Sequence, residues 1–233
     1  ALTDILVDLV HRLNVLTDAS SIALVLSVVR AIVAQVASND ALTQSLIILL
    51  SAVLGTIQCD SLDEVTQLIS LLSRRTLTGA LPDEAVANFL APSVSASGVR
   101  VYGTAGYNLT VADLPFAFDS EVLAQAAGVN STAFVDITIT RYGQSLRRCR
   151  GDKVVGDIIS IDIHKGGNLT NVTGLQNGVE FWLPIDANVT LNSSTSSCHY
   201  EGRTGEVQRT ESFTCSWWDP IVQLWTSAGC QTI

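Results

Sequence analysis

Apolar residues recur at helical spacing through the first part of the chain. Leucine, isoleucine and valine every three or four positions predict helices over residues 3–16, about 20–38 and about 41–58. The second and third of these segments are apolar nearly all round, which is typical of helices buried in a bundle. Polar residues such as Arg30 and Gln35 interrupt the roughly 20-residue apolar run that a membrane span needs, so a membrane hairpin is only the alternative.

Two further helices are predicted from signals at their ends. Ser61 followed by Glu64 three residues later is a capping-box pattern, and it predicts a helix over about residues 62–75. Pro82 stands where a first helical residue is favoured, and it predicts a short helix that ends near Leu90. Helices therefore account for the chain up to that point.

Beyond the helices the period changes to two, which predicts strands. Asp136 and Asp162 alternate with apolar neighbours in two of these strands, and we expect both carboxylates to be exposed. One short helix, over about residues 120–127, interrupts the strands. The pattern predicts an α+β fold with a helical part over residues 1–92 and a β part over 93–233. The predicted strands cover residues 99–102, 134–140, 158–163 and 179–185.

Composition and charge exclude some classes of partner. Of the 233 residues, 47% are hydrophobic and only 15% are charged, so the chain can bury a substantial core and is not expected to be disordered. The formal net charge is −9, which argues against nucleic acid, whose phosphates require basic patches. The same charge disfavours an anionic membrane surface.

Sequons for N-glycosylation cluster in the β part of the chain. All of them follow residue 100, and none falls in the helical part. This distribution predicts an extracellular chain with one glycosylated region, for which N-linked glycans are the expected modification. The sequon asparagines are Asn108, Asn130, Asn168, Asn171, Asn188 and Asn192.

The cysteines are spaced as in a disulfide-bonded extracellular protein rather than a zinc site. The chain has five cysteines and three scattered histidines, with no C-x-x-C pair. Disulfides are therefore the expected state of Cys149, Cys198, Cys215 and Cys230, while Cys59 at a helix end is most simply a buried thiol. The odd count leaves one thiol free or paired outside the chain. With no Met and no visible signal peptide, the chain is expected to be an internal piece of a longer protein.

One dense motif lies near the end of the chain. Within residues 215–230 stand two cysteines, three tryptophans, an aspartate and a glycine. The spacing C-x-aromatic-W-D followed by W-[ST]-x-x-G-C resembles the first half of the GPS motif, which closes the GAIN domain of adhesion receptors and polycystin-like proteins. A tryptophan-rich disulfide corner of another β-sandwich is the alternative. The motif core comprises Trp217, Trp218, Asp219, Trp225 and Gly229.

The resemblance implies a particular architecture and disulfide pattern. GAIN domains have a helical subdomain followed by a twisted antiparallel β-sandwich, whose last strands carry the GPS motif, so residues 1–92 and 93–233 would be the two subdomains. In the family, Cys215 and Cys230 would each pair with a cysteine of a following C-x-C. A local alternative is a pair between Cys198 and Cys215, on a hairpin whose arms are 198–200 and 213–215.

No enzyme chemistry is predicted from the residues of this chain. GAIN self-cleavage uses a base and a Thr or Ser nucleophile that follow the first half of the motif, and His199 does not fit that pattern. No phosphate-binding loop, metalloprotease motif or serine-hydrolase motif is present, so no catalytic residue, cofactor or metal ligand is assigned. Lys165-Gly166-Gly167 indicates only a turn.

The sequence and the resemblance together predict a function at the cell surface. We expect a juxtamembrane GAIN-like domain of a surface glycoprotein, with a structural, adhesive and signal- or force-transmitting role. Its partners would be a following C-terminal segment or transmembrane region and other extracellular proteins. The alternative is an extracellular carbohydrate-binding or matrix module in which Trp182, Trp217 and Trp225 stack on sugars. An enzyme with a noncontiguous site is a third hypothesis.

Overall fold

The structure is a computed structural model of the whole chain. It describes residues 19–35, 39–56, 61–84, 87–103, 106–128, 133–143, 157–170 and 179–181, and the backbone of residues 193–200, 203–210, 217–219 and 224–226. The chain divides into two compact units, Ala1–Ile185 and Asp186–Ile233. The first unit holds all the described helices, a five-stranded sheet and a three-stranded sheet.

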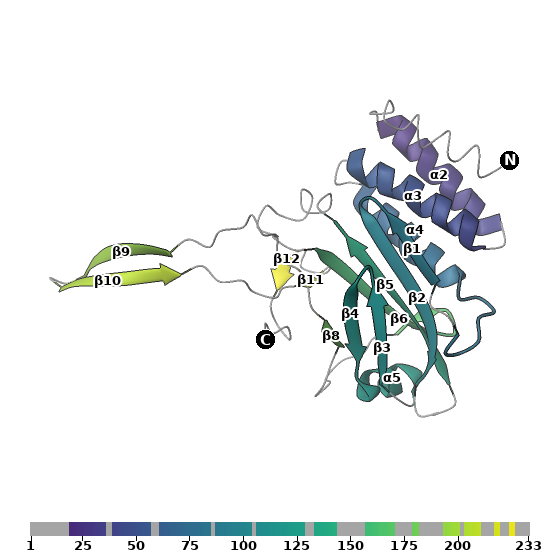
Figure 1. The fold of residues 1–233 in the computed structure, drawn as a ribbon. Helices are drawn as coiled ribbons and strands as arrows, with labels where there is room; N and C mark the ends of the chain where they lie inside the picture. Colours follow the sequence, from purple (N-terminus) through teal and green to yellow (C-terminus); the bar gives the residue numbers. More distant parts are fainter. Residues whose placement is uncertain are drawn as a thin grey trace. The chain divides into compact units, whose positions relative to one another are not determined.

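Three helices cover one face of the five-stranded sheet (Figure 1). They are α2 (Ala19–Gln35), α3 (Asp40–Thr56) and α4 (Leu62–Arg75), and each confirms a predicted helix. Helices α3 and α4 contact the sheet, while α2 packs against α4. The helix predicted over residues 3–16 lies outside the described residues. None of the described helices is long and apolar enough to cross a membrane.

The capping box predicted at the start of α4 does not form. Ser61 precedes α4 with φ −97° and ψ 2°, outside the extended region that a capping residue adopts, and its side chain makes no capping hydrogen bond. Glu64 instead pairs with Arg30 of α2, 2.6 Å away, and so joins two helices. A side-chain cap occurs at α3, where Asn39 Oδ1 accepts from the Leu42 amide at 2.8 Å.

The main sheet is antiparallel throughout, with strand order β1-β2-β5-β6-β7. A second antiparallel sheet has the order β3-β4-β8, and helix α5 (Ser120–Ala127) follows β4. Helices followed by two antiparallel sheets confirm the predicted α+β fold, and α5 has the predicted bounds. The strands are β1 (Ala87–Ala91), β2 (Val94–Tyr102), β3 (Tyr107–Val111), β4 (Leu114–Phe118), β5 (Phe134–Tyr142), β6 (Ile158–Lys165), β7 (Asn168–Leu169) and β8 (Val179–Phe181).

The prediction of a helix from Pro82 to Leu90 is wrong, because β1 occupies the end of that segment. Asp83 has φ +62°, which is incompatible with a helix, and its amide donates to the Arg100 carbonyl at 2.8 Å. In β1, Phe89 is buried while Leu90 is exposed, which is strand alternation. The side chain of Gln44 on α3 completes the strand by bonding both the amide and the carbonyl of Leu90.

The five-stranded sheet separates two apolar cores. On one face, α2, α3 and α4 pack together with Phe89, Val94 and Tyr142. On the other face, β2, β5 and β6 pack against the three-stranded sheet and α5, with Phe116 and Ile137 at the centre. Successive residues of β2 and β5 therefore serve different cores, as the period of two requires.

The described residues of the second unit form two hairpins. Strand β9 (Ser193–Tyr200) pairs with β10 (Arg203–Thr210), and β11 (Trp217–Asp219) pairs with β12 (Leu224–Thr226). The expected hairpin with arms 198–200 and 213–215 is wrong, because the second arm begins at Arg203 and Cys198 lies opposite Gly205. The subdomain boundary predicted between residues 92 and 93 stays a prediction.

Gly103 allows α5 to approach the end of β2. A Cβ at this position would lie 2.2 Å from Ala127 Cβ and 3.0 Å from the Leu123 carbonyl oxygen. We expect Gly103→Ala to lower the free energy of unfolding by about 1–3 kcal/mol, because α5 must move away from the sandwich. Urea unfolding followed by circular dichroism measures this change.

Gly143→Ala is the matched control. A Cβ at Gly143 would meet its nearest neighbour, the Ser93 carbonyl oxygen, at an ordinary 3.7 Å. Its expected effect is within about 0.5 kcal/mol of zero. Equal losses from the two substitutions would contradict the close packing of α5 on β2.

Candidate functional site

The face of the main sheet that meets α4 is polar where β5 and β6 run side by side. The ladder pairs Asp136 with His164, Thr138 with Asp162, and Thr140 with Ser160. All six side chains lie on the same face, because paired residues share a face and alternate residues repeat it. A strip of hydroxyl, carboxylate and imidazole groups therefore lies beneath a helix.

A buried ion pair lies at one end of this strip. Arg100 of β2 binds both carboxylate oxygens of Asp136, at 2.6 Å from Nε and 3.0 Å from Nη2. The guanidinium also lies 4.4 Å from the centre of the Phe134 ring and donates to the Ala80 carbonyl at 2.9 Å. The expectation that Asp136 is exposed is wrong: it is 6% exposed, because the cross-strand arginine neutralises its charge.

A groove of about 380 Å³ opens between α4 and β6. Its volume falls within the usual range for small-molecule sites, roughly 300–1,000 Å³. Residues of α4 form one wall, and β6 with the turn that follows it forms the other. The lining residues are Thr66, Gln67, Ser70, Leu71, Arg74, Tyr142, Ser160, Asp162, His164 and Leu169.

Hydrogen bonds from α4 set the width of this groove. Ser70 Oγ donates to Asp162 Oδ2 at 2.6 Å, so the Asp162 carboxylate is partly covered by the helix. One turn later, Arg74 Nη1 donates to the Gly167 carbonyl at 2.6 Å. Gly166 and Gly167 have φ +56° and +85°, the backbone that a tight two-residue hairpin needs, which confirms the predicted turn.

His164 is the most unusual side chain at the groove. It is 6% exposed, and its Nδ1 atom has no hydrogen-bond partner. The only other buried side-chain atom without a partner among the described residues is Thr138 Oγ1, which is paired in register with Asp162. Burial lowers the pKa of His164, with a further lowering from Arg74, while Asp162 and Asp136 act in the opposite direction. The imidazole is therefore neutral at pH 7.

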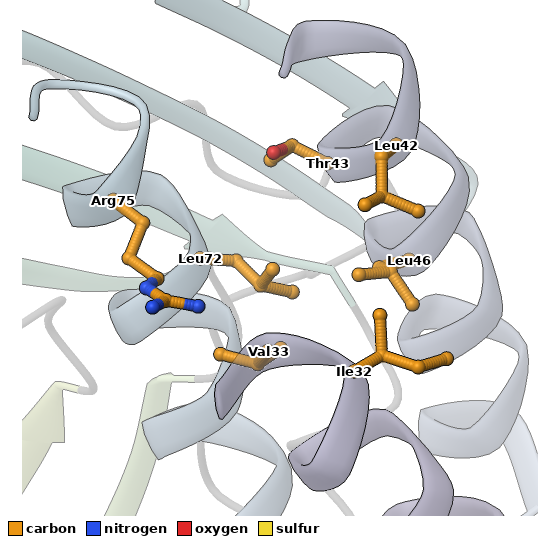
Figure 2. Close-up of a pocket in the computed structure, with 7 residues that line it drawn as sticks. All are labelled: Ile32, Val33, Leu42, Thr43, Leu46, Leu72 and Arg75. Atoms are coloured by element: carbon orange, nitrogen blue, oxygen red, sulfur yellow. The ribbon is translucent and has the colours of Figure 1, made fainter. Parts of the chain in front are cut away.

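A second, much smaller void lies among the helices. Figure 2 shows it between Ile32 and Val33 of α2, Leu46 of α3, and Leu72 and Arg75 of α4. Its volume is about 10 Å³, close to the space of a single water molecule. We interpret it as a packing gap of the helical layer and not as a ligand site.

The structure describes two of the predicted glycosylation sites. Asn108 lies on β3, an edge strand, and both it and Thr110 are exposed. Asn168 is exposed on β7. Glycan attachment at these positions stays a prediction. The other sequon asparagines, Asn130, Asn171, Asn188 and Asn192, lie outside the described residues.

The motif tryptophans are brought together by one hairpin. Trp217, Trp218 and Asp219 form β11, and its register places Trp218 opposite Trp225 of β12. His199 lies on β9 opposite Thr204. The predicted disulfides stay predictions, since the structure gives only the backbone position of Cys198. The remaining motif and alternative residues, Cys59, Cys149, Trp182, Cys215, Gly229 and Cys230, lie outside the described residues.

Within the described part of the chain, no three His, Cys, Asp or Glu side chains are grouped so as to hold a metal ion.

The sequence analysis did not predict the groove, although one of its two walls follows from the strand pattern. Strand alternation places Asp162 and His164 on one face of β6. Nothing in the sequence shows that Ser70 and Arg74, about 90 residues earlier, cross above that face.

The buried ion pair generates a prediction about stability. Asp136→Asn removes the charge that balances Arg100, whose side chain is 14% exposed, and should lower the free energy of unfolding by about 3 kcal/mol. Glu64→Gln is the matched control, because the Glu64 and Arg30 side chains are 35% and 65% exposed. This variant should lower the free energy of unfolding by less than about 1 kcal/mol. Chemical denaturation at pH 7 distinguishes the two. Similar losses would show that the Arg100–Asp136 pair is not effectively buried.

His164 generates a prediction about pH. Its folded-state pKa is below the ordinary value of 6.5, so on acidification the unfolded chain binds the proton first. The contribution of His164 to stability is therefore complete above about pH 6.5 and declines as the pH falls below it. Unfolding in urea at pH 7.5 and 5.5 should show this loss, and His164→Gln should reduce it. A variant with the same pH dependence as the parent would contradict the assignment.

No model of a known protein family matches the chain, and no curated protein matches its sequence. The GAIN resemblance therefore rests on the spacing within residues 215–230 and on the order of helices and strands.

Proposed function

We propose that the chain is an extracellular, GAIN-like domain of a cell-surface glycoprotein with a structural and adhesive role. The observation that carries this proposal is the hairpin that pairs Trp218 with Trp225, following a helical layer and two antiparallel sheets. That order of elements, with the motif tryptophans on the last described strands, is the order expected of a GAIN domain. The proposed function rests on the resemblance to GAIN domains and not on an arrangement of catalytic residues.

The central sheet supports a role in bearing force. Strands β2 and β5 pair over nine residues each, from Val94 opposite Tyr142 to Tyr102 opposite Phe134. The sheet is buried on both faces, which protects its backbone hydrogen bonds from water. Such a scaffold would hold a following segment and pass tension to a membrane partner.

The surface features support an extracellular setting. The net charge of −9 and the exposed sequons at Asn108 and Asn168 fit a solvated, glycosylated domain. In this proposal the partners are the following segment or transmembrane region of the same protein and other extracellular proteins. Receptor-like and polycystin-like owners both fit.

A carbohydrate-binding module is the second candidate. The observation that favours it is the polar groove between α4 and β6, which lies away from the motif tryptophans in the chain. The two candidates are compatible, because a surface domain can both hold a segment and bind a sugar.

Disulfide mapping of the full-length protein by peptide mass spectrometry tests the first proposal. We expect Cys215 and Cys230 each to be linked to a cysteine of a C-x-C that follows residue 233, as in the GPS motif. A new N-terminal Thr or Ser after that C-x-C would identify self-cleavage. A Cys198–Cys215 or Cys215–Cys230 bond would instead contradict the GPS assignment and favour another disulfide-stapled β-sandwich.

A further inference from the structure

The groove between α4 and β6 has the shape of a small-molecule site. It is about 380 Å³ in volume, and it is walled by two rigid elements. Bonds from Ser70 to Asp162 and from Arg74 to Gly167 hold those elements together. The walls are therefore fixed before any ligand arrives, which lowers the entropic cost of binding.

The charges of the groove favour a neutral ligand. Arg74 supplies one positive charge and Asp162 one negative charge, and the buried His164 is neutral at pH 7. At one end of the strip, Asp136 is already neutralised by Arg100. An anion would be attracted by Arg74 but repelled by Asp162, and a cation would meet the reverse, so neither sign of charge is favoured.

The polar groups offer both donors and acceptors at short range. The amide of Gln67 and the hydroxyl of Ser160 can each donate and accept a hydrogen bond. The Thr66 hydroxyl already donates to the Asp63 carbonyl and can still accept, and Asp162 has a second carboxylate oxygen. A ligand with several hydroxyl groups matches such a mixed set, because each hydroxyl also donates and accepts.

One residue that lines the groove, His164, has a buried atom without a partner, Nδ1. The other such atom, Thr138 Oγ1, lies opposite Asp162 in the ladder but is not part of the groove lining. A buried polar atom without a partner is costly, so a ligand hydroxyl that bonds His164 Nδ1 gains most there. Leu71 and the exposed Leu169 supply apolar surface at the rim for the C–H face of a ring.

We propose that this groove binds a neutral sugar ring, held by Gln67, Ser160, Asp162 and His164 and flanked by Leu71 and Leu169. The site is separate in sequence from the tryptophans of the β11–β12 hairpin. It does not depend on the GAIN resemblance, so either proposal can fail without the other.

Ligand-observed saturation-transfer NMR on the full chain tests the proposal. The probes are glucose, mannose, galactose and N-acetylglucosamine, with glucuronate as a probe that differs from glucose by one carboxylate. We expect at least one neutral sugar to bind. When the protein's own amide signals are followed during a titration with that sugar, the shift changes should be confined to α4, β6 and the 166–167 turn. Glucuronate should bind more weakly than glucose.

Matched variants locate the site. Asp162→Asn keeps a side-chain oxygen that can accept the hydrogen bond from Ser70, so the fold is retained. The substitution removes the negative charge of the group that would accept from the sugar. We expect it to weaken sugar binding about tenfold, the effect of losing a charge-assisted hydrogen bond. Gln67 lies at an exposed position of α4. Gln67→Ala should weaken binding several-fold, because it removes one hydrogen bond worth about 1 kcal/mol.

The control is Glu180→Gln, which removes one carboxylate from an exposed position of β8 in the other sheet. It should leave sugar affinity unchanged. The proposal is overturned if no neutral sugar binds, if glucuronate binds more tightly than glucose, or if Asp162→Asn and Gln67→Ala bind as the parent does. Binding lost equally in the Glu180→Gln variant would also overturn it, since that loss would not come from the groove.

Discussion

The constraint on which this structure depends is that the main sheet is buried on both faces. Along β2 and β5, one set of alternate residues enters the sandwich core with Ile137, and the other set meets the helices. Gly98 shows how close that second contact is, because a Cβ there would lie 3.1 Å from the Ser73 carbonyl oxygen of α4. At this position a side chain fits only if the α4 backbone or Leu77 moves by a few tenths of an ångström.

The polar strip follows from this constraint. Buried polar groups must find partners, and most of those under α4 do: Asp136 binds Arg100, and Asp162 accepts from Ser70. His164 Nδ1 and Thr138 Oγ1 have no hydrogen-bond partner, and His164 also lines the groove. The same packing that orders the helical layer thus creates the one described site where a small polar ligand gains hydrogen bonds. The central sheet is at once scaffold and candidate binding surface.

Much of the fold was predictable from local pattern. Apolar spacing predicted α2 and α3, and strand alternation predicted β5 and β6, because each pattern is set by the element itself. Helix α4 was predicted from a capping-box pattern, and the helix forms although the capping bond does not. The sequence-based predictions were wrong where the secondary structure or burial of a residue depends on a partner far along the chain. Residues 87–91 became a strand because β2 and Gln44 supply its hydrogen bonds. Asp136 is buried because Arg100 stands opposite it, and no local pattern contains that pairing. For the same reason the groove, formed where α4 crosses β6, could not be foreseen.

Amide hydrogen exchange is the most direct test of this account. Its central claim is that the helical layer and the main sheet form one cooperative unit, joined through the face beneath α4. If so, the slowest amides of α4 and of β5 should exchange through a common opening, with the same free energy and the same response to denaturant. If α4 opened at much lower free energy while β5 stayed protected, the helices would be a loosely attached layer. The groove would then lack the rigid wall that a binding site requires.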